Sequence, residues 1–126
     1  MKPPNDVTAI KNYHAHVYYG DASARARAEA VRTGAGALNV PVELGRWHDA
    51  PIGPHPIGSY QIAFEAAGFA DLVPWLALNR RGLSILIHPN TGDALADHSD
   101  HAIWLGTQLA LDFEMLRRFM AENKPA

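Results

Sequence analysis

The chain of 126 residues contains no cysteine and only three lysines. Without cysteine there is no thiolate zinc site, no disulfide framework and no cysteine nucleophile. With a net charge of -2, the chain also lacks the dense basic surface that a nucleic-acid-binding protein needs to displace phosphate counterions. We therefore expect small molecules as partners, and side chains other than thiols for any chemistry.

Long apolar runs are missing too. No stretch approaches the roughly 18 apolar residues of a membrane span, and the polar segment 1–11, with two prolines, lacks the apolar core of a signal peptide. We expect a cytoplasmic protein that binds neither nucleic acid nor a membrane. The length and the apolar fraction of 48% are typical of one globular domain, which we expect to span residues 1–126.

Histidine, by contrast, occurs seven times. His14 and His16 lie in the segment 13–19, YHAHVYY, whose alternation and content of aromatic and β-branched residues predict a strand. Side chains two residues apart share one face of a strand, so these two imidazoles would lie together. Because neutral imidazole is the commonest metal ligand in proteins, the sequence points to chemistry based on histidine.

Capping and turn signals divide the rest of the chain. Asp21 is the expected cap of an alanine-rich helix that ends near two glycines, and Asp71 is the expected cap of a second helix. An amphipathic C-terminal helix is predicted over about 107–122, after a loop and a short strand within 98–106. Three further strands are predicted, over residues 38–44, 57–65 and 83–88.

The order β-α-β-β-α-β predicts an α+β fold of the ferredoxin-like type, an antiparallel sheet with both helices on one face, plus a C-terminal extension and helix. Its core would span about 12–106. We expect the first and third strands to be parallel neighbours, with the fourth antiparallel beside the first. The helices should cover the face that bears Ala15 and Val17, which leaves His14 and His16 on the opposite, open face, where a pocket or a dimer contact could form.

In that arrangement the starts of strands one and three meet the end of strand four, which brings four histidines to one edge of the sheet. The three best candidates for metal ligands are His16, His55 and His88. His14 could either ligate the same ion or stay free as an acid/base group. A lone histidine on a strand is more often a half-buried residue bonded to its neighbours, but four converging histidines favour a site.

The remaining histidines carry less weight. His98 lies in an acidic segment whose carboxylates could orient a ligating imidazole, and we assign it a catalytic role. His48 and His101 are expected to be incidental surface residues. No HExxH motif is present, so a zinc hydrolase is the least favoured interpretation.

Taken together, four segments resemble the DOPA 4,5-dioxygenase family of small non-heme iron extradiol dioxygenases and their bacterial relatives. The resemblance covers about residues 13–106, and the combination of GPHP with HPxTGD is its most specific part. The four segments are YHAHVYY, GRWHDAPIGPHPIGSYQIAF, VPWLALNRRGLSILIHPNTGD and DHSDHAIWLG.

The resemblance implies a ferredoxin-like fold that is commonly dimeric, and cleavage of a catechol such as L-DOPA by O₂ next to its two hydroxyls. It matches His16, His55 and His88 to a mainly histidine Fe(II) site, although a purified sample could carry Zn instead. His14 or His98 would then be the acid/base group. The alternative is a ferredoxin-like dimeric protein that binds a metal or a small molecule without dioxygenase turnover.

Overall fold

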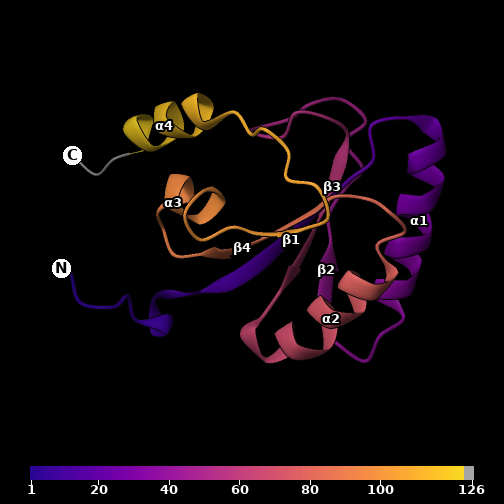
Figure 1. The fold of residues 1–126 in the computed structure, drawn as a ribbon, viewed down its shortest axis with the longest axis horizontal. Helices are drawn as coiled ribbons and strands as arrows, with labels where there is room; N and C mark the ends of the chain where they lie inside the picture. Colours follow the sequence, from indigo (N-terminus) through magenta and orange to yellow (C-terminus); the bar gives the residue numbers. More distant parts are fainter. Residues whose placement is uncertain (124–126) are drawn as a thin grey trace.

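A five-stranded antiparallel sheet forms the centre of the structure (Figure 1). The structure is a computed structural model that describes residues 1–123. Its strand order is β2-β3-β1-β4-β5, so the predicted ferredoxin-like order is confirmed and a fifth strand is added at one edge. The strands are β1 (Asn12–Tyr18), β2 (Val42–Leu44), β3 (Ser59–Phe64), β4 (Ile85–Asn90) and β5 (Ile103–Leu105).

Strand β1 pairs antiparallel with both of its neighbours, β3 and β4. The expectation that the first and third strands run parallel is therefore wrong. The physical reason is the reversal between β2 and β3: β2 is antiparallel to β3, so β3 runs opposite to β1. As a result Tyr18, at the end of β1, lies opposite Ser59 at the start of β3, whereas His14 lies opposite His88 near the end of β4.

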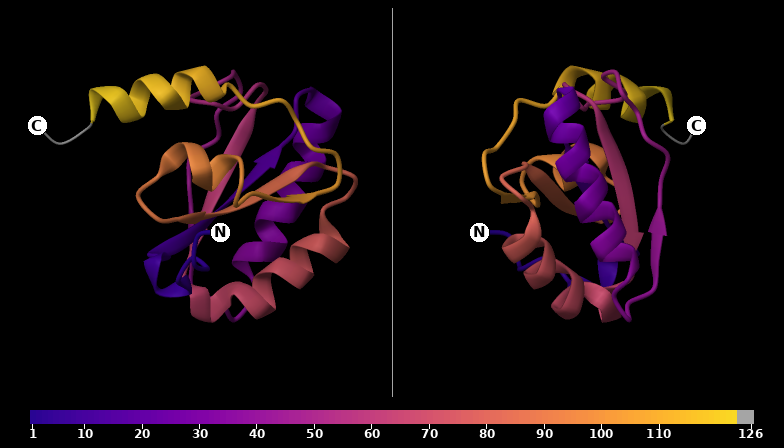
Figure 2. Two further views of the ribbon diagram at one scale, coloured as in Figure 1. Left: turned by 60° about the vertical axis from the view of Figure 1, so that its left-hand side comes forward. Right: turned by 90° about the vertical axis from the view of Figure 1, so that its right-hand side faces the viewer.

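Two helices cover one face of the sheet: α1 (Ala22–Gly36) and α2 (Phe69–Asn79), as Figure 2 shows. The Asp21 carboxylate accepts a hydrogen bond from Ala24 N, which confirms the predicted cap of α1. Asp71 does not cap α2 as expected, because the helix begins at Phe69, directly after a short 3₁₀ turn, η2 (Ala66–Gly68). Asp71 lies instead in the first turn, where its negative charge interacts favourably with the positive end of the helix dipole.

The main core lies between this face and the two helices. Alternate residues of β1, Ala15 and Val17, are fully buried there against the apolar residues of α1, α2 and the neighbouring strands. Ile62 of β3 and Ile87 of β4 are equally buried in the same core. The prediction that the helices cover the Ala15 and Val17 face, and leave His14 and His16 on the other, is confirmed.

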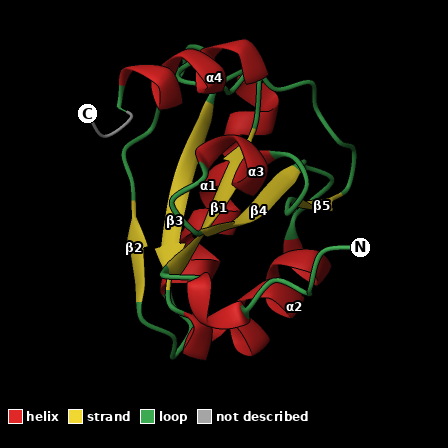
Figure 3. Ribbon diagram, turned by 90° about the vertical axis from the view of Figure 1, so that its left-hand side faces the viewer, coloured by secondary structure: helices red, strands yellow, loops and turns green. Residues whose placement is uncertain are grey.

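The opposite face is only partly covered, by α3 (Ala94–His98) and α4 (Phe113–Glu122), as Figure 3 shows. The sequence predicts no element for residues 94–97, and the structure forms a short helix there that ends at His98. The C-terminal helix begins at Phe113, later than the predicted position near 107, because the Asp112 carboxylate caps it by accepting from Met115 N. A second apolar cluster, which includes Tyr18, Leu86 and Leu111, anchors this layer to the sheet.

Strand ends differ from the predictions by a few residues. β2 is shorter than the predicted 38–44, and it lies at an edge of the sheet as expected. β4 continues beyond His88 to Asn90, so this histidine lies inside a strand rather than at its end. Within residues 1–123, no helix is both long enough and apolar enough to cross a membrane.

A cluster of five histidines as a candidate metal centre

Five imidazoles gather on the partly covered face of the sheet, and we call them the histidine cluster: His14 and His16 from β1, His88 from β4, His55 from the segment before β3, and His98 from α3. Every histidine that the sequence proposed for the site is therefore in this cluster, and His48 and His101 are not members of it.

The sheet positions three members of the cluster through its register. His14 and His88 are direct cross-strand partners, with ring centroids 5.2 Å apart, and His16 is two residues along on the same face. The Nε2 atoms of His16 and His88 are 3.0 Å apart. Two nitrogens about 2.1 Å from one ion and at about 90° to each other lie about 3.0 Å apart, so this pair is spaced as ligands of a shared ion would be.

His55 reaches the cluster by a different route from the predicted one. Since β3 starts beside the end of β1, the segment before β3 enters from the Tyr18 end of the sheet and folds over the open face. The His55 amide donates to Ile52 O at 2.9 Å, and His48 exchanges backbone hydrogen bonds with Ser59. These contacts fix the segment, and the His55 and His16 rings lie 4.2 Å apart, centroid to centroid.

His98 is held in place by α3, and α3 is held by Asp97. The Asp97 side chain, only 2% exposed, accepts hydrogen bonds from Thr91 N at 2.9 Å and Thr91 Oγ1 at 2.7 Å. This ties α3 to the turn after β4, and places the His98 ring 4.0 Å from that of His88. The Asp97 carboxylate thus supports the site by fixing α3, and it does not itself bond an imidazole.

All five imidazoles have a pKa below the ordinary histidine value. Burial is the main cause, and it lowers the pKa of His55 to about 4 and of His88 to about 3, with repulsion from neighbouring histidines adding to it. Burial lowers the pKa of His16 still more clearly, and those of His14 and His98 in the same direction. The cluster is therefore neutral at pH 7, which is the form that binds metals.

Two imidazoles have their tautomer fixed by peptide carbonyls, which only accept hydrogen bonds. His88 Nδ1 donates to Pro89 O at 2.8 Å, and His98 Nδ1 donates to Ala94 O at 2.7 Å. In a neutral ring the proton on Nδ1 leaves a lone pair on Nε2. Both Nε2 atoms can therefore bind an ion or accept a proton, in the arrangement that metal-binding histidines commonly have.

Two overlapping groups of three donors satisfy the spacing that one ion needs, with ligand atoms within 4.8 Å of one another. They share His16: one group is His14, His16 and His88, and the other is His16, His55 and His98. The sequence-predicted set of His16, His55 and His88 takes members from both. Imidazole-only donors suit Fe, Zn, Cu or Ni better than Mg or Ca, so the residues fit a transition metal.

Sequence reasoning missed two side chains at the cluster. The Tyr18 hydroxyl lies 2.6 Å from His55 Nδ1, and Tyr18 is only 2% exposed. Its position two residues after His16 on the same strand face was the available signal. Glu43, on β2, lies on the same face across β3 from His14, and its charge opposes the effect of burial on the His14 pKa.

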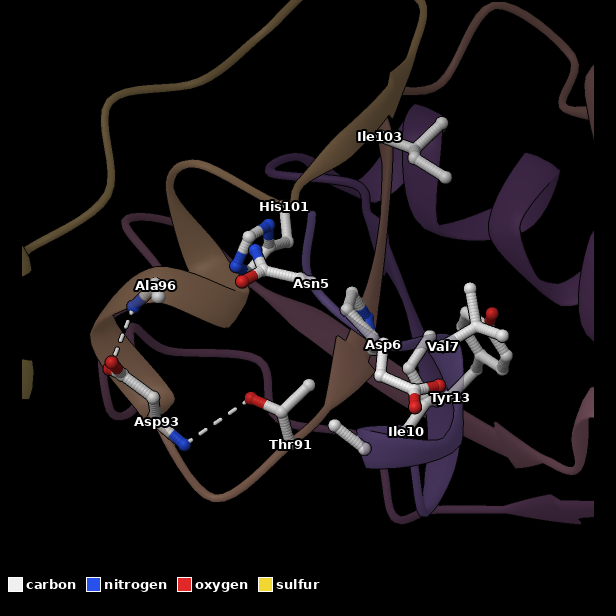
Figure 4. Close-up of a pocket in the computed structure, with 12 residues that line it drawn as sticks. Asn5, Asp6, Val7, Ile10, Tyr13, Thr91, Asp93, Ala96, His101 and Ile103 are labelled. Carbon is white, nitrogen blue, oxygen red and sulfur yellow. Dashed lines mark hydrogen bonds between the residues drawn. The ribbon is translucent and has the colours of Figure 1, made fainter. Parts of the chain in front are cut away.

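A hollow of about 240 Å³ adjoins the cluster and is lined by His16, His55, His48, Ile52 and Gln61 among others. His48, expected to be incidental, thus borders the site. A larger hollow of about 540 Å³ lies elsewhere, between the N-terminal segment and the β4–α3 turn (Figure 4). His101 lines it together with Asp6 and Asp93, whose carboxylates accept hydrogen bonds from backbone N–H groups, and its lining includes no member of the histidine cluster.

Comparisons with known proteins identify relatives of this chain. A DOPA 4,5-dioxygenase from Amanita muscaria is 34% identical over 91% of this chain, and an uncharacterized 21.2 kDa protein from Botryotinia fuckeliana is 41% identical over 65% of it. The chain spans about half the length of these curated relatives, 56% and 49% respectively. A crystal structure of a candidate dioxygenase from Nostoc punctiforme, 53% identical, superposes with a TM-score of 0.89 over 92% of this chain and 99% of that one.

The family model of the Dopa 4,5-dioxygenase family matches residues 13–115. That range contains all five members of the histidine cluster and, apart from Asn12 at the start of β1, all residues of the five strands. The chain belongs to the Dopa 4,5-dioxygenase family.

Proposed function

We propose that the protein is an extradiol dioxygenase that opens the ring of a catechol such as L-DOPA at an Fe(II) centre held by the histidine cluster. The observation that carries this proposal is the pair of Nε2 atoms, on His16 and His88, that lie 3.0 Å apart within a cluster of five neutral imidazoles. Membership of the Dopa 4,5-dioxygenase family supports the choice of reaction.

In this proposal His16 and His88 are ligands, and His55 is the third ligand expected from the sequence. His14 and His98 are the proposed acid/base groups. When bound, Fe(II) supplies the electron transfer between catechol and O₂ and places both next to each other. One ring C–C bond beside the two hydroxyls breaks, and both atoms of O₂ enter the product.

The chain itself provides a proton acceptor and a binding site for the aromatic ring of the catechol. His98 Nε2 carries a lone pair, because Nδ1 donates to Ala94 O, so it can accept a hydroxyl proton of the catechol. The adjoining hollow of about 240 Å³ is small, which favours a single aromatic ring with a short tail. Ile52 offers the ring an apolar contact there, and Gln61 a polar one.

The partners in this proposal are the catechol and O₂, and the protein acts as a homodimer. Light scattering of the purified protein measures its mass in solution and so tests the homodimer directly. A single species with the mass of one chain would contradict it.

The reaction is tested by adding L-DOPA and O₂ to protein reconstituted with Fe(II) under anaerobic conditions. We expect a yellow ring-opened product and consumption of one O₂ per catechol. If L-DOPA, caffeate and other catechols give no absorbance change with any of several metals, the protein is instead a metal- or small-molecule-binding member of the family without turnover.

The ligand assignment is tested by metal content. We expect His16→Ala and His88→Ala to abolish metal uptake, since each removes one of the two closest donors. His48→Ala is the matched control, because His48 borders the hollow without belonging to either donor group, and it should take up metal as the unmodified protein does. Equal metal content in all three variants would contradict the assignment.

A further inference from the structure

The buried hydroxyl of Tyr18 makes a contact that neither the family match nor the proposed reaction explains. It lies 2.6 Å from His55 Nδ1, and among residues 1–123 it has no other hydrogen-bond partner. The Tyr18 ring is stacked on Trp104, with centroids 5.9 Å apart, and packs with Leu86 and Leu111. The hydroxyl is therefore held in one position and cannot turn to water.

The direction of this hydrogen bond follows from which atoms can be satisfied. If Tyr18 donates to His55 Nδ1, the hydroxyl proton has its partner and the His55 ring carries its own proton on Nε2. If His55 Nδ1 donates instead, the buried hydroxyl proton is left without an acceptor, which is costly away from water. Burial raises the pKa of Tyr18, so the hydroxyl keeps the proton that it donates.

We propose that Tyr18 is a positioning residue that holds His55 as the Nε2–H tautomer, so that His55 donates a hydrogen bond to an oxygen atom of the bound substrate instead of ligating the metal. This inference rests on the proposed function and revises it at two residues: His55 is no longer a ligand, and His14 becomes the third ligand in place of an acid/base group. A ring that carries a proton on Nε2, and whose Nδ1 accepts from Tyr18, has no lone pair left for an ion.

The contrast with the other members of the cluster supports this assignment. His88 and His98 donate from Nδ1 to peptide carbonyls and keep the Nε2 lone pair, whereas His55 is bonded to a hydroxyl that can donate. Of the two donor groups, only the one without His55 then stays complete: the ligands are His14, His16 and His88, all from two neighbouring strands. His55 and His98 lie over these ligands: His55 donates a hydrogen bond to the substrate, and His98 accepts a proton from it.

The tautomer is measured on the metal-free protein by long-range ¹⁵N–¹H spectroscopy of the imidazole rings. We expect His55 to show a protonated Nε2 and an unprotonated Nδ1, the reverse of His88. In Tyr18→Phe, which keeps the ring against Trp104, the His55 preference should be lost while that of His88 is unchanged. A proton on His55 Nδ1 in the unmodified protein overturns the proposal.

Zn(II) titration by calorimetry supplies a second readout that needs no turnover. We expect His55→Gln and Tyr18→Phe to bind Zn(II) within about threefold of the unmodified protein, whereas His88→Gln, the matched change at a ligand, should weaken binding about 100-fold. A loss in His55→Gln as large as that in His88→Gln overturns the proposal. Failure of catechol cleavage with the expected tautomer and Zn(II) binding would overturn the proposed reaction alone.

Discussion

The two faces of the sheet are built from the same strands and hold opposite kinds of residue. In β1, Ala15 and Val17 point into the core beneath α1 and α2, while His14 and His16 point to the other side. Apolar packing fixes the register on the first face, and that register brings His14 opposite His88 on the second. Packing of the apolar face therefore sets the positions of the histidines on the polar face.

The layer that covers the polar face is held by different contacts from those that hold the helices over the core. Its covering layer depends on individual polar contacts, such as those of Asp97 with Thr91 and of Tyr18 with His55, as well as on the smaller apolar cluster. These few contacts are enough to hold the short segments outside the sheet that carry His55 and His98. The comparison predicts that changes to the two faces have separable effects on stability and on metal binding.

The largest effect is expected from the core. Ile62 is fully buried against the helices, whereas its neighbour Gln61 points to the polar face and lines the hollow. Ile62→Ala should lower the free energy of unfolding by about 2 to 5 kcal/mol through lost burial and a cavity, and Gln61→Ala by less than about 0.5 kcal/mol. Urea denaturation of the metal-free protein measures both, and similar losses would contradict the separation of the faces.

The next effect is a pH dependence that belongs to the polar face alone. Burial lowers the pKa of His55 to about 4, so on acidification the unfolded chain, with its ordinary histidine pKa near 6.5, binds the proton first. The stability of the metal-free protein is then full above pH 6.5 and falls towards pH 4, by about 3 kcal/mol from His55.

Urea denaturation at several pH values tests this slope. His55→Gln removes one of the titrating groups and should show a shallower loss between pH 6.5 and pH 4, while Ile62→Ala should keep the slope of the unmodified protein at a lower stability. A slope that is unchanged by His55→Gln would show that this imidazole is not buried in its neutral form.

The smallest of the three effects is expected where the covering layer meets the sheet. Asp97→Asn keeps the shape of the side chain but weakens its hydrogen bonds to Thr91 N and Oγ1, and should cost about 1 to 2 kcal/mol. Hydrogen exchange should show faster opening of 94–98 with the β1 amides still protected. Equal loosening of β1 would mean that the covering layer and the sheet open together.

Much of this arrangement could be predicted from the sequence, because it follows from local periodicity. The alternation in YHAHVYY placed His14 and His16 on one face, and the alanine spacing after Asp21 gave the first helix. The convergence of four histidines followed from the order of the strands, although the prediction that β1 and β3 run parallel was wrong. His88 was placed near the right end of its strand beside His14.

What escaped prediction depends on contacts between distant segments. The path of His55 over the open face is set by the backbone contacts of the segment before β3, which has no periodic pattern of its own. A helix as short as Ala94–His98 gives too few turns for a helical repeat to show. The hydrogen bond of Tyr18 with His55 links residues 37 positions apart, so the alternation in β1 places Tyr18 on the face of His16 but does not identify His55 as its partner.

The separation of His16 and His88 by 72 positions along the chain also sets the order of events during synthesis. A ribosome that has just released β1 has made the HxH pair, but the partner from β4 does not yet exist. The pair is completed only when β4 inserts beside β1, a step that closes a long loop and that the core must stabilise. In the proposed function, metal binding is therefore a late step of folding, because the His16 and His88 donors come together only after the central strands are in register.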